Sequence, residues 1–131
     1  MRIQVKDFMI TSIVTSTADK TVKEIRELME YNGIHAVPII AYEKKLPNNE
    51  TTIQGIVTTS DLVGITNDFA IVEDFMTNNV HIVHQESSAK AAAKMMLKHD
   101  VHHIVVMDKG HIVGIISSAD FVKLVAEHSL E

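Results

Sequence analysis

Two short segments of the sequence place a hydroxyl side chain three residues ahead of a carboxylate. They run from Gly55 to Asp61 (GIVTTSD) and from Gly114 to Asp120 (GIISSAD). In each, an Ile/Val-rich run predicts a strand that turns directly into a helix. The free amides and dipole of such a helix start favour an anion, a hydroxyl can bind phosphate, and a carboxylate can accept ribose hydroxyls. The candidate ligand contacts are Thr58, Asp61, Ser117 and Asp120.

The same residues have a simpler interpretation as helix caps. Ser, Thr and Asp are preferred at helix N-termini, where each cap contributes about 1 kcal/mol without any ligand. Gly55 and Gly114 also have two interpretations, because a missing side chain admits either a base or another stretch of backbone. Residue chemistry alone leaves ligand binding and capping as open alternatives.

Histidine is concentrated in the second half of the sequence, where seven of the eight histidines follow residue 80. A strand over 101–107 would send His102 and His103 to opposite faces, and His81 and His84 diverge in an extended segment. We therefore expect no metal site, and metal binding by this His-rich half is kept as a third interpretation. The sequence has no nucleophile elbow, phosphate loop or dinucleotide fingerprint, so we expect no enzyme activity.

Composition restricts the class of protein and of partner. The chain has 131 residues, 12 basic and 17 acidic, with a net charge of −5. This length suits one compact domain or two very small units, and the acidic balance argues against a nucleic-acid polymer as partner. The sequence lacks a membrane-length apolar run, an apolar signal-peptide core and cysteine. We therefore expect a cytoplasmic protein without a membrane partner.

An internal repeat organises the sequence. An offset of 67 aligns residues 5–40 with 72–107, with seven identities in 36 pairs, and VKDFM at the start of the first segment returns as VEDFM. An offset of 59 then aligns residues 53–63 with 112–122, with five identities in 11 pairs. We therefore expect two similar units, 1–66 and 67–131, related by pseudo-two-fold symmetry.

Each repeat predicts the same order of elements, β-α-β-β-α, and hence an α/β (α+β) fold with helices on a small mixed sheet. Thr21 and Glu24 fit a capping box at the start of the first helix. The first repeat is longer because of an extended hairpin loop at 42–52, where the second has a tight turn containing Gly110. The expected extended segments are 13–16 and 80–83, the expected strands are 34–41, 53–58, 101–107 and 112–117, and the closing helices begin near Ser60-Asp61 and Ala119-Asp120.

This duplicated order, with these local sequences, resembles the cystathionine-β-synthase (CBS) domain pair, or Bateman module. The resemblance covers nearly the whole chain. It rests on the paired Asp-Phe-Met starts, on His35-Ala-Val-Pro-Ile39, and on the two Gly-to-Asp segments. It implies a stand-alone regulatory module that binds an adenosine-containing nucleotide (AMP, ADP, ATP or a related compound) in clefts between the two units and signals to an unidentified partner.

The resemblance also implies roles for individual residues. Asp61 and Asp120 would contact ribose, Thr58 and Ser117 phosphate, while His35 and His102 would be structural or line the cleft. Many family members carry a basic residue directly after this histidine, where the present sequence has Ala36 in one repeat and His103 in the other. We therefore expect asymmetric sites, with the phosphorylated nucleoside favouring Ser117, Asp120 and His103, and with no required cofactor.

The family commonly forms homodimers through apolar helix faces. The candidate contact residues in this sequence are Leu62, Val63, Ile65, Val122 and Val125, and burial in the module's own core is an equal alternative. The chief rival function is a ligand-free dimerisation or scaffold module. The final Ser-Leu-Glu (129–131) is consistent with non-native sequence.

Overall fold

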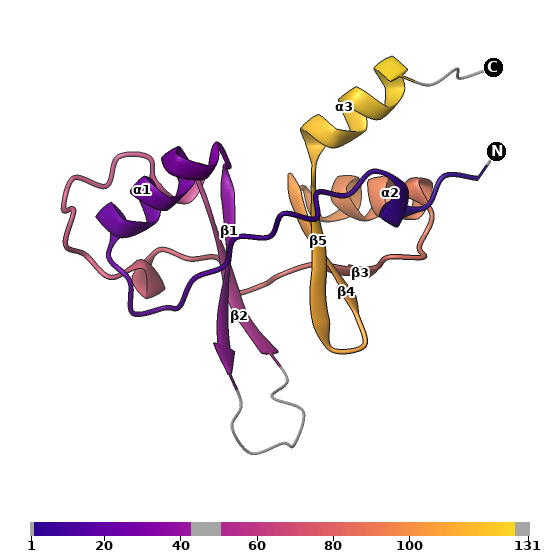
Figure 1. Cartoon of the computed structure of the whole chain (residues 1–131). Coiled ribbons are helices and arrows are strands. Elements are labelled where there is room, and N and C mark those ends of the chain that lie inside the picture. The colour runs from indigo at the N-terminus through magenta and orange to yellow at the C-terminus, as the bar shows by residue number, and fades with distance from the viewer. Residues whose placement is uncertain (1, 43–50, 128–131) are drawn as a thin grey trace. The chain divides into compact units, whose positions relative to one another are not determined.

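The computed structural model describes residues 2–42 and 51–127, and it divides the chain into two compact units. The central unit is Val14–Val80, and the terminal unit joins Met1–Ile13 to His81–Glu131. Each contains helical segments and a small sheet, which is the α+β fold expected (Figure 1). The boundary expected at 66/67 separates the sequence repeats, whereas packing divides the chain after residues 13 and 80.

The central unit is built on a hairpin of β1 (Ala36–Tyr42) and β2 (Thr51–Thr58), which pair antiparallel. Helix α1 (Val22–Asn32) begins with the expected capping box, in which Thr21 and Glu24 accept each other's backbone N–H bonds. The expected segment 13–16 forms no strand, but Ser16 makes a parallel bridge to β1 at Ile39. The predicted loop at 42–52 falls largely outside the described residues.

The terminal unit has a three-stranded sheet and two helices. β3 (Ile82–His84) runs parallel to β4 (His103–Asp108), which pairs antiparallel with β5 (His111–Ser117). α2 (Ala89–His99) joins β3 to β4, and α3 (Ser118–Glu127) follows β5. The β4–β5 turn has positive φ at both Lys109 (50°) and Gly110 (78°), which confirms the expected tight turn.

The helix expected to begin near Ser60-Asp61 is not formed. Only a single 3-10 turn, η2 (Ser60–Leu62), follows β2, and the backbone becomes extended at Val63. Gly64 then adopts a φ of +80°, a left-handed conformation that stops a right-handed helix. The equivalent stretch after Asp120 has Lys, Leu, Val and Ala instead, and it forms part of the ten-residue helix α3.

Each Asp-Phe-Met segment packs against the hairpin of the other sequence repeat, not against the hairpin of its own. η1 (Val5–Asp7) buries Val5 in the terminal core, with Phe8 and Met9 packed against it. η3 (Val72–Asp74) buries Val72 in the central core, with Phe75 and Met76 packed against it. The remaining buried residues of the central core are Val22, Ile25, Met29, Val37, Ile39, Val57 and Leu62, and those of the terminal core are Val83, Ala92, Met96, Ile104, Val106 and Ile116.

The packing of the Asp-Phe-Met segments explains the glycines that begin the two Gly-to-Asp segments. A Cβ on Gly55 would lie 2.8 Å from the Thr77 carbonyl oxygen, and one on Gly114 would lie 2.6 Å from Met9 Sδ. Another stretch of backbone or a methionine therefore occupies the space that a side chain would need. Of the two interpretations open from the sequence, close approach of protein is the one that the structure shows.

Candidate functional site

At the central junction, Asp61 reaches back to Thr58 at the end of β2. The Thr58 N–H and hydroxyl donate to Asp61 Oδ2 at 2.9 and 3.1 Å, and the Asp61 N–H lies 3.3 Å from Thr58 Oγ1. The Thr77 hydroxyl adds a third contact to the carboxylate, at 3.2 Å from Oδ1. Both oxygens of Asp61 therefore accept hydrogen bonds from the protein.

The terminal junction repeats the first part of this geometry. The Ser117 N–H and hydroxyl donate to Asp120 Oδ2 at 2.8 and 3.1 Å. Asp120 is the third residue of α3 and only 7% exposed, so it closes the helix start like the acidic member of a capping box. Within the described residues both of its hydrogen bonds go to Oδ2, which leaves Oδ1 as the oxygen available to a ligand hydroxyl.

The histidines flank these junctions in equivalent ways. His35 and His102 are exposed, and their carbonyl oxygens accept the N–H bonds of Thr59 and Ser118 at 2.9 and 3.0 Å. The His102 Nδ1 also lies 3.2 Å from the Ser118 hydroxyl. Both histidines thus lie beside a junction, and their backbone carbonyl groups connect the start of each hairpin to its end.

The residue after each histidine pairs with the junction hydroxyl across the hairpin. Ala36 is opposite Thr58 in β1–β2, and His103 is opposite Ser117 in β4–β5. Directly opposed residues of an antiparallel pair share a face, with Cβ atoms about 4.5–5.5 Å apart. His103 therefore lies beside the Ser117 hydroxyl, whereas Ala36 brings no charge to Thr58.

The other histidines make local contacts. The rings of His81 and His99 stack with centroids 4.2 Å apart, and His84 Nε2 lies 3.1 Å from Asp108 Oδ1. Partial loss of water contact, together with the neighbouring His81 and Lys98, lowers the pKa of His99. Among residues 2–42 and 51–127, no three His, Asp or Glu side chains gather into a group that could hold a metal ion.

The apolar residues considered for dimerisation divide into two groups. Leu62 is 3% exposed and belongs to the central core, and Ile65 packs against that core. Val63, Val122 and Val125 are 75%, 69% and 54% exposed. No described helix has the length and apolarity needed to cross a membrane.

Thr77 is the site residue that the sequence reasoning missed. The signal was present, because the repeat offset of 67 aligns Thr77 with Ile10, a difference between a hydroxyl and a hydrocarbon at equivalent positions. The two residues make equivalent bridges, Thr77 to Ile56 and Ile10 to Ile115. The asymmetry between the junctions thus involves two positions, the Ala36/His103 pair and the Thr77/Ile10 pair.

Known proteins resemble this chain along most of its length. An inosine-5′-monophosphate dehydrogenase of Korarchaeum cryptofilum is 28% identical over 88% of this chain, but the chain spans only 23% of that enzyme. A putative acetoin utilization protein (AcuB) of Vibrio cholerae is 28% identical, with a TM-score of 0.77 over 97% of this chain and 93% of that one. The CBS domain pair of protein MJ0100, solved with 5′-methylthioadenosine and S-adenosyl-L-methionine, has a TM-score of 0.83 at 22% identity over 97% and 98%.

The family assignment follows the sequence repeats. The model of the CBS domain matches residues 5–67 and again 72–127. Each match begins two residues before an Asp-Phe-Met segment and includes one of the two junctions. The chain therefore belongs to the CBS domain family, and it carries two copies of the domain.

Proposed function

We propose that this chain is a regulatory module that binds an adenosine-containing nucleotide and passes its occupancy to a partner protein. The observation that carries the proposal is the terminal junction, where Ser117, Asp120 and His103 lie together at the start of a ten-residue helix. The CBS pair of MJ0100, which has the same fold, was solved with two adenosine compounds. Binding acts on the partner only if the ligand prefers one of two arrangements of the module.

The terminal junction suits a phosphorylated nucleoside. Asp120 Oδ1 is positioned to accept a ribose hydroxyl, and the Ser117 hydroxyl and a protonated His103 are suited to phosphate. The positive end of the α3 dipole adds to the attraction for an anion. Since neither Lys nor Arg is paired opposite Ser117, we expect AMP to bind at least as tightly as ATP.

The central junction suits a less charged compound. It is followed by a three-residue turn rather than a helix, so the dipole term is small, and Ala36 supplies no cation. Both oxygens of Asp61 are already hydrogen-bonded. We propose that this junction is empty or takes an adenosine compound without phosphate.

A second candidate function is a ligand-free dimerisation or scaffold module. One observation favours it, namely that the Asp carboxylates at both junctions already make capping interactions within the protein. The exposed side chains of Val63, Val122 and Val125 would then serve a homodimer. Under this alternative the junction residues stabilise the fold and bind nothing.

Calorimetric titration of ligand-free protein separates the two functions. We expect AMP to bind, Asp120→Asn to weaken AMP binding by tenfold or more, and Asp61→Asn to leave it within about twofold. A thermal-shift panel of AMP, ADP, ATP, S-adenosylmethionine and Zn²⁺ adds a second readout, since ligand at 100 Kd stabilises by about 2.7 kcal/mol. Equal affinities of the two variants would contradict the asymmetry, and no binding of any adenosine compound would support the scaffold.

A further inference from the structure

A cavity of about 350 Å³ lies in the central unit, between α1 and the extended segment that precedes it. This volume is at the lower end of the range for small-molecule pockets. The cavity includes Ile40, whereas the Thr58 junction is opposite Ala36, four residues and roughly 13 Å along β1. The cavity is therefore separate from the Thr58 junction of the same unit.

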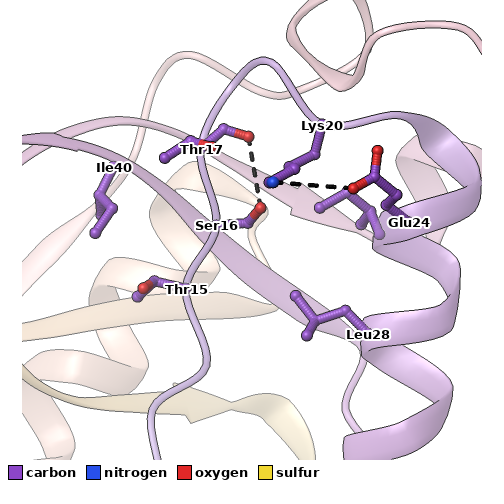
Figure 2. A pocket seen from close by; sticks show the side chains of 8 residues that line it. Thr15, Ser16, Thr17, Lys20, Glu24, Leu28 and Ile40 are labelled. Carbon is purple, nitrogen blue, oxygen red and sulfur yellow. Dashed lines mark hydrogen bonds and ion pairs between the residues drawn. The ribbon is translucent and has the colours of Figure 1, made fainter.

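The cavity has an apolar floor and a polar rim. Ile25 and Ile40 are buried at 1% and 6% exposure, and Leu28 lines the cavity with them. Lys20 and Glu24 are each about half exposed and form an ion pair at 3.9 Å. Figure 2 shows their side chains extending toward the space between α1 and the segment 15–17, which contributes three successive hydroxyl residues.

The polar residues of the rim are held in place by hydrogen bonds within the protein. Glu24 Oε1 accepts from the Thr21 backbone and hydroxyl in the capping box, so Oε2 is the oxygen that faces Lys20. The Lys20 carbonyl accepts the Val72 N–H at 2.8 Å. On the opposite wall, the Ser16 carbonyl accepts the Ile40 N–H at 2.8 Å. The rim is therefore preorganised by the backbone of the unit.

One cation and one anion side by side above an apolar floor match a zwitterion with an apolar side chain. We propose that this cavity binds a free α-amino acid with a branched apolar side chain. Its carboxylate meets Lys20 Nζ, its ammonium meets Glu24 Oε2, and its side chain lies on Leu28 and Ile40. A simple anion would face Glu24 and a simple cation would face Lys20, so molecules with a single charge are disfavoured.

The test titrates the full chain with L-leucine and monitors binding by the ¹H–¹⁵N chemical shifts of the backbone amides. We expect saturable shifts at the amides of Thr15–Thr17 and of residues 24–28, unchanged by the presence of AMP. 4-Methylpentanoate and isoamylamine, which each keep one charge, are expected to bind at least tenfold more weakly. No saturation with L-leucine at millimolar concentrations would overturn the proposal, whether or not AMP binds.

Variants of the ion pair identify the site. Lys20→Gln and Glu24→Gln should each weaken leucine binding about tenfold, and Gln at position 24 retains the capping box. The matched controls are Lys23→Gln and Glu27→Gln, exposed residues of α1 that do not line the cavity and should leave binding unchanged. If Glu24→Gln leaves leucine binding unchanged, the ammonium group does not meet this carboxylate and the zwitterion assignment is wrong.

Discussion

The Thr77 hydroxyl donates to the Asp61 carboxylate, at 3.2 Å from Oδ1 and 3.4 Å from Oδ2. The equivalent residue in the terminal unit is Ile10, whose side chain has no hydrogen-bond donor. A ribose at Asp61 must therefore compete with a protein hydroxyl, whereas a ribose at Asp120 meets no such competitor at the equivalent position. The Thr77/Ile10 difference acts on the carboxylate itself, and it adds to the difference between Ala36 and His103 opposite the junction hydroxyls.

Exchanging this residue type should shift ligand preference between the junctions. Thr77→Val keeps the shape of the side chain and releases Asp61 Oδ1, so we expect adenosine to bind the central junction several-fold more tightly. Ile10→Thr should weaken AMP binding at the terminal junction by a similar factor. Calorimetry checks both, with circular dichroism to confirm folding. Weaker adenosine binding by Thr77→Val would show that the hydroxyl assists a ligand rather than competing with it.

The two motif glycines should differ in how strongly they resist a methyl group. Overpacking of this kind costs about 1–3 kcal/mol. Gly55→Ala should lie near the upper end, because its Cβ meets the Thr77 backbone carbonyl as well as Met76. Gly114→Ala should cost less, since its closest neighbour is the flexible thioether of Met9 and its backbone neighbour, the Ile10 carbonyl oxygen, lies farther away at 3.1 Å. Urea unfolding measures both, and a Gly55→Ala variant within 0.5 kcal/mol of the parent would contradict the packing described.

Sequence periodicity and the internal repeat predicted the hairpins and the capping box of α1. They succeeded because these features depend on local spacing, and Thr21 and Glu24 lie within one helical turn. The missing helix after Asp61 could have been predicted. Gly64 and Asn67 interrupt the stretch that corresponds to the Lys, Leu, Val and Ala of α3.

The destination of the Asp-Phe-Met segments could not be predicted from the repeat. Alignment shows that Met9 and Met76 are equivalent, but equivalence holds equally whether each packs on its own repeat or on the other one. Only packing shows that Met9 lies against Gly114 and Met76 against Gly55. The cavity beside Lys20 was missed for a related reason, since its walls combine α1, β1 and an extended segment.

Arg26 should stabilise the irregular segment that replaces the helix after η2. Its Nη2 donates to the carbonyl oxygens of Leu62 and Ile65 at 2.8 and 2.7 Å, and Nη1 lies 3.4 Å from Asp68 Oδ1. Arg26→Met keeps the apolar stem and removes these donors, so we expect a loss of about 1–3 kcal/mol in unfolding free energy. Amide hydrogen exchange should rise at residues 62–68. Lys23→Met, an exposed change on the same helix, is the control and should cost less than 0.5 kcal/mol.

The His81–His99 stack should make stability fall in mild acid. The pKa of His99 lies below its usual 6.5, first because of partial loss of water contact and then because of His81 and Lys98. The folded state therefore binds fewer protons at His99 than the unfolded state does. The stability that the neutral His99 ring contributes is complete above the unfolded pKa of about 6.5, and it is lost as the pH falls through the lower folded pKa. An NMR titration of His99 Hε1 measures that pKa directly. His81→Gln should raise the pKa of His99 toward 6.5 without reaching it. The control His111→Gln, at an exposed residue of β5, should leave that pKa unchanged. An unchanged pKa in His81→Gln would show that the stack does not oppose protonation of His99.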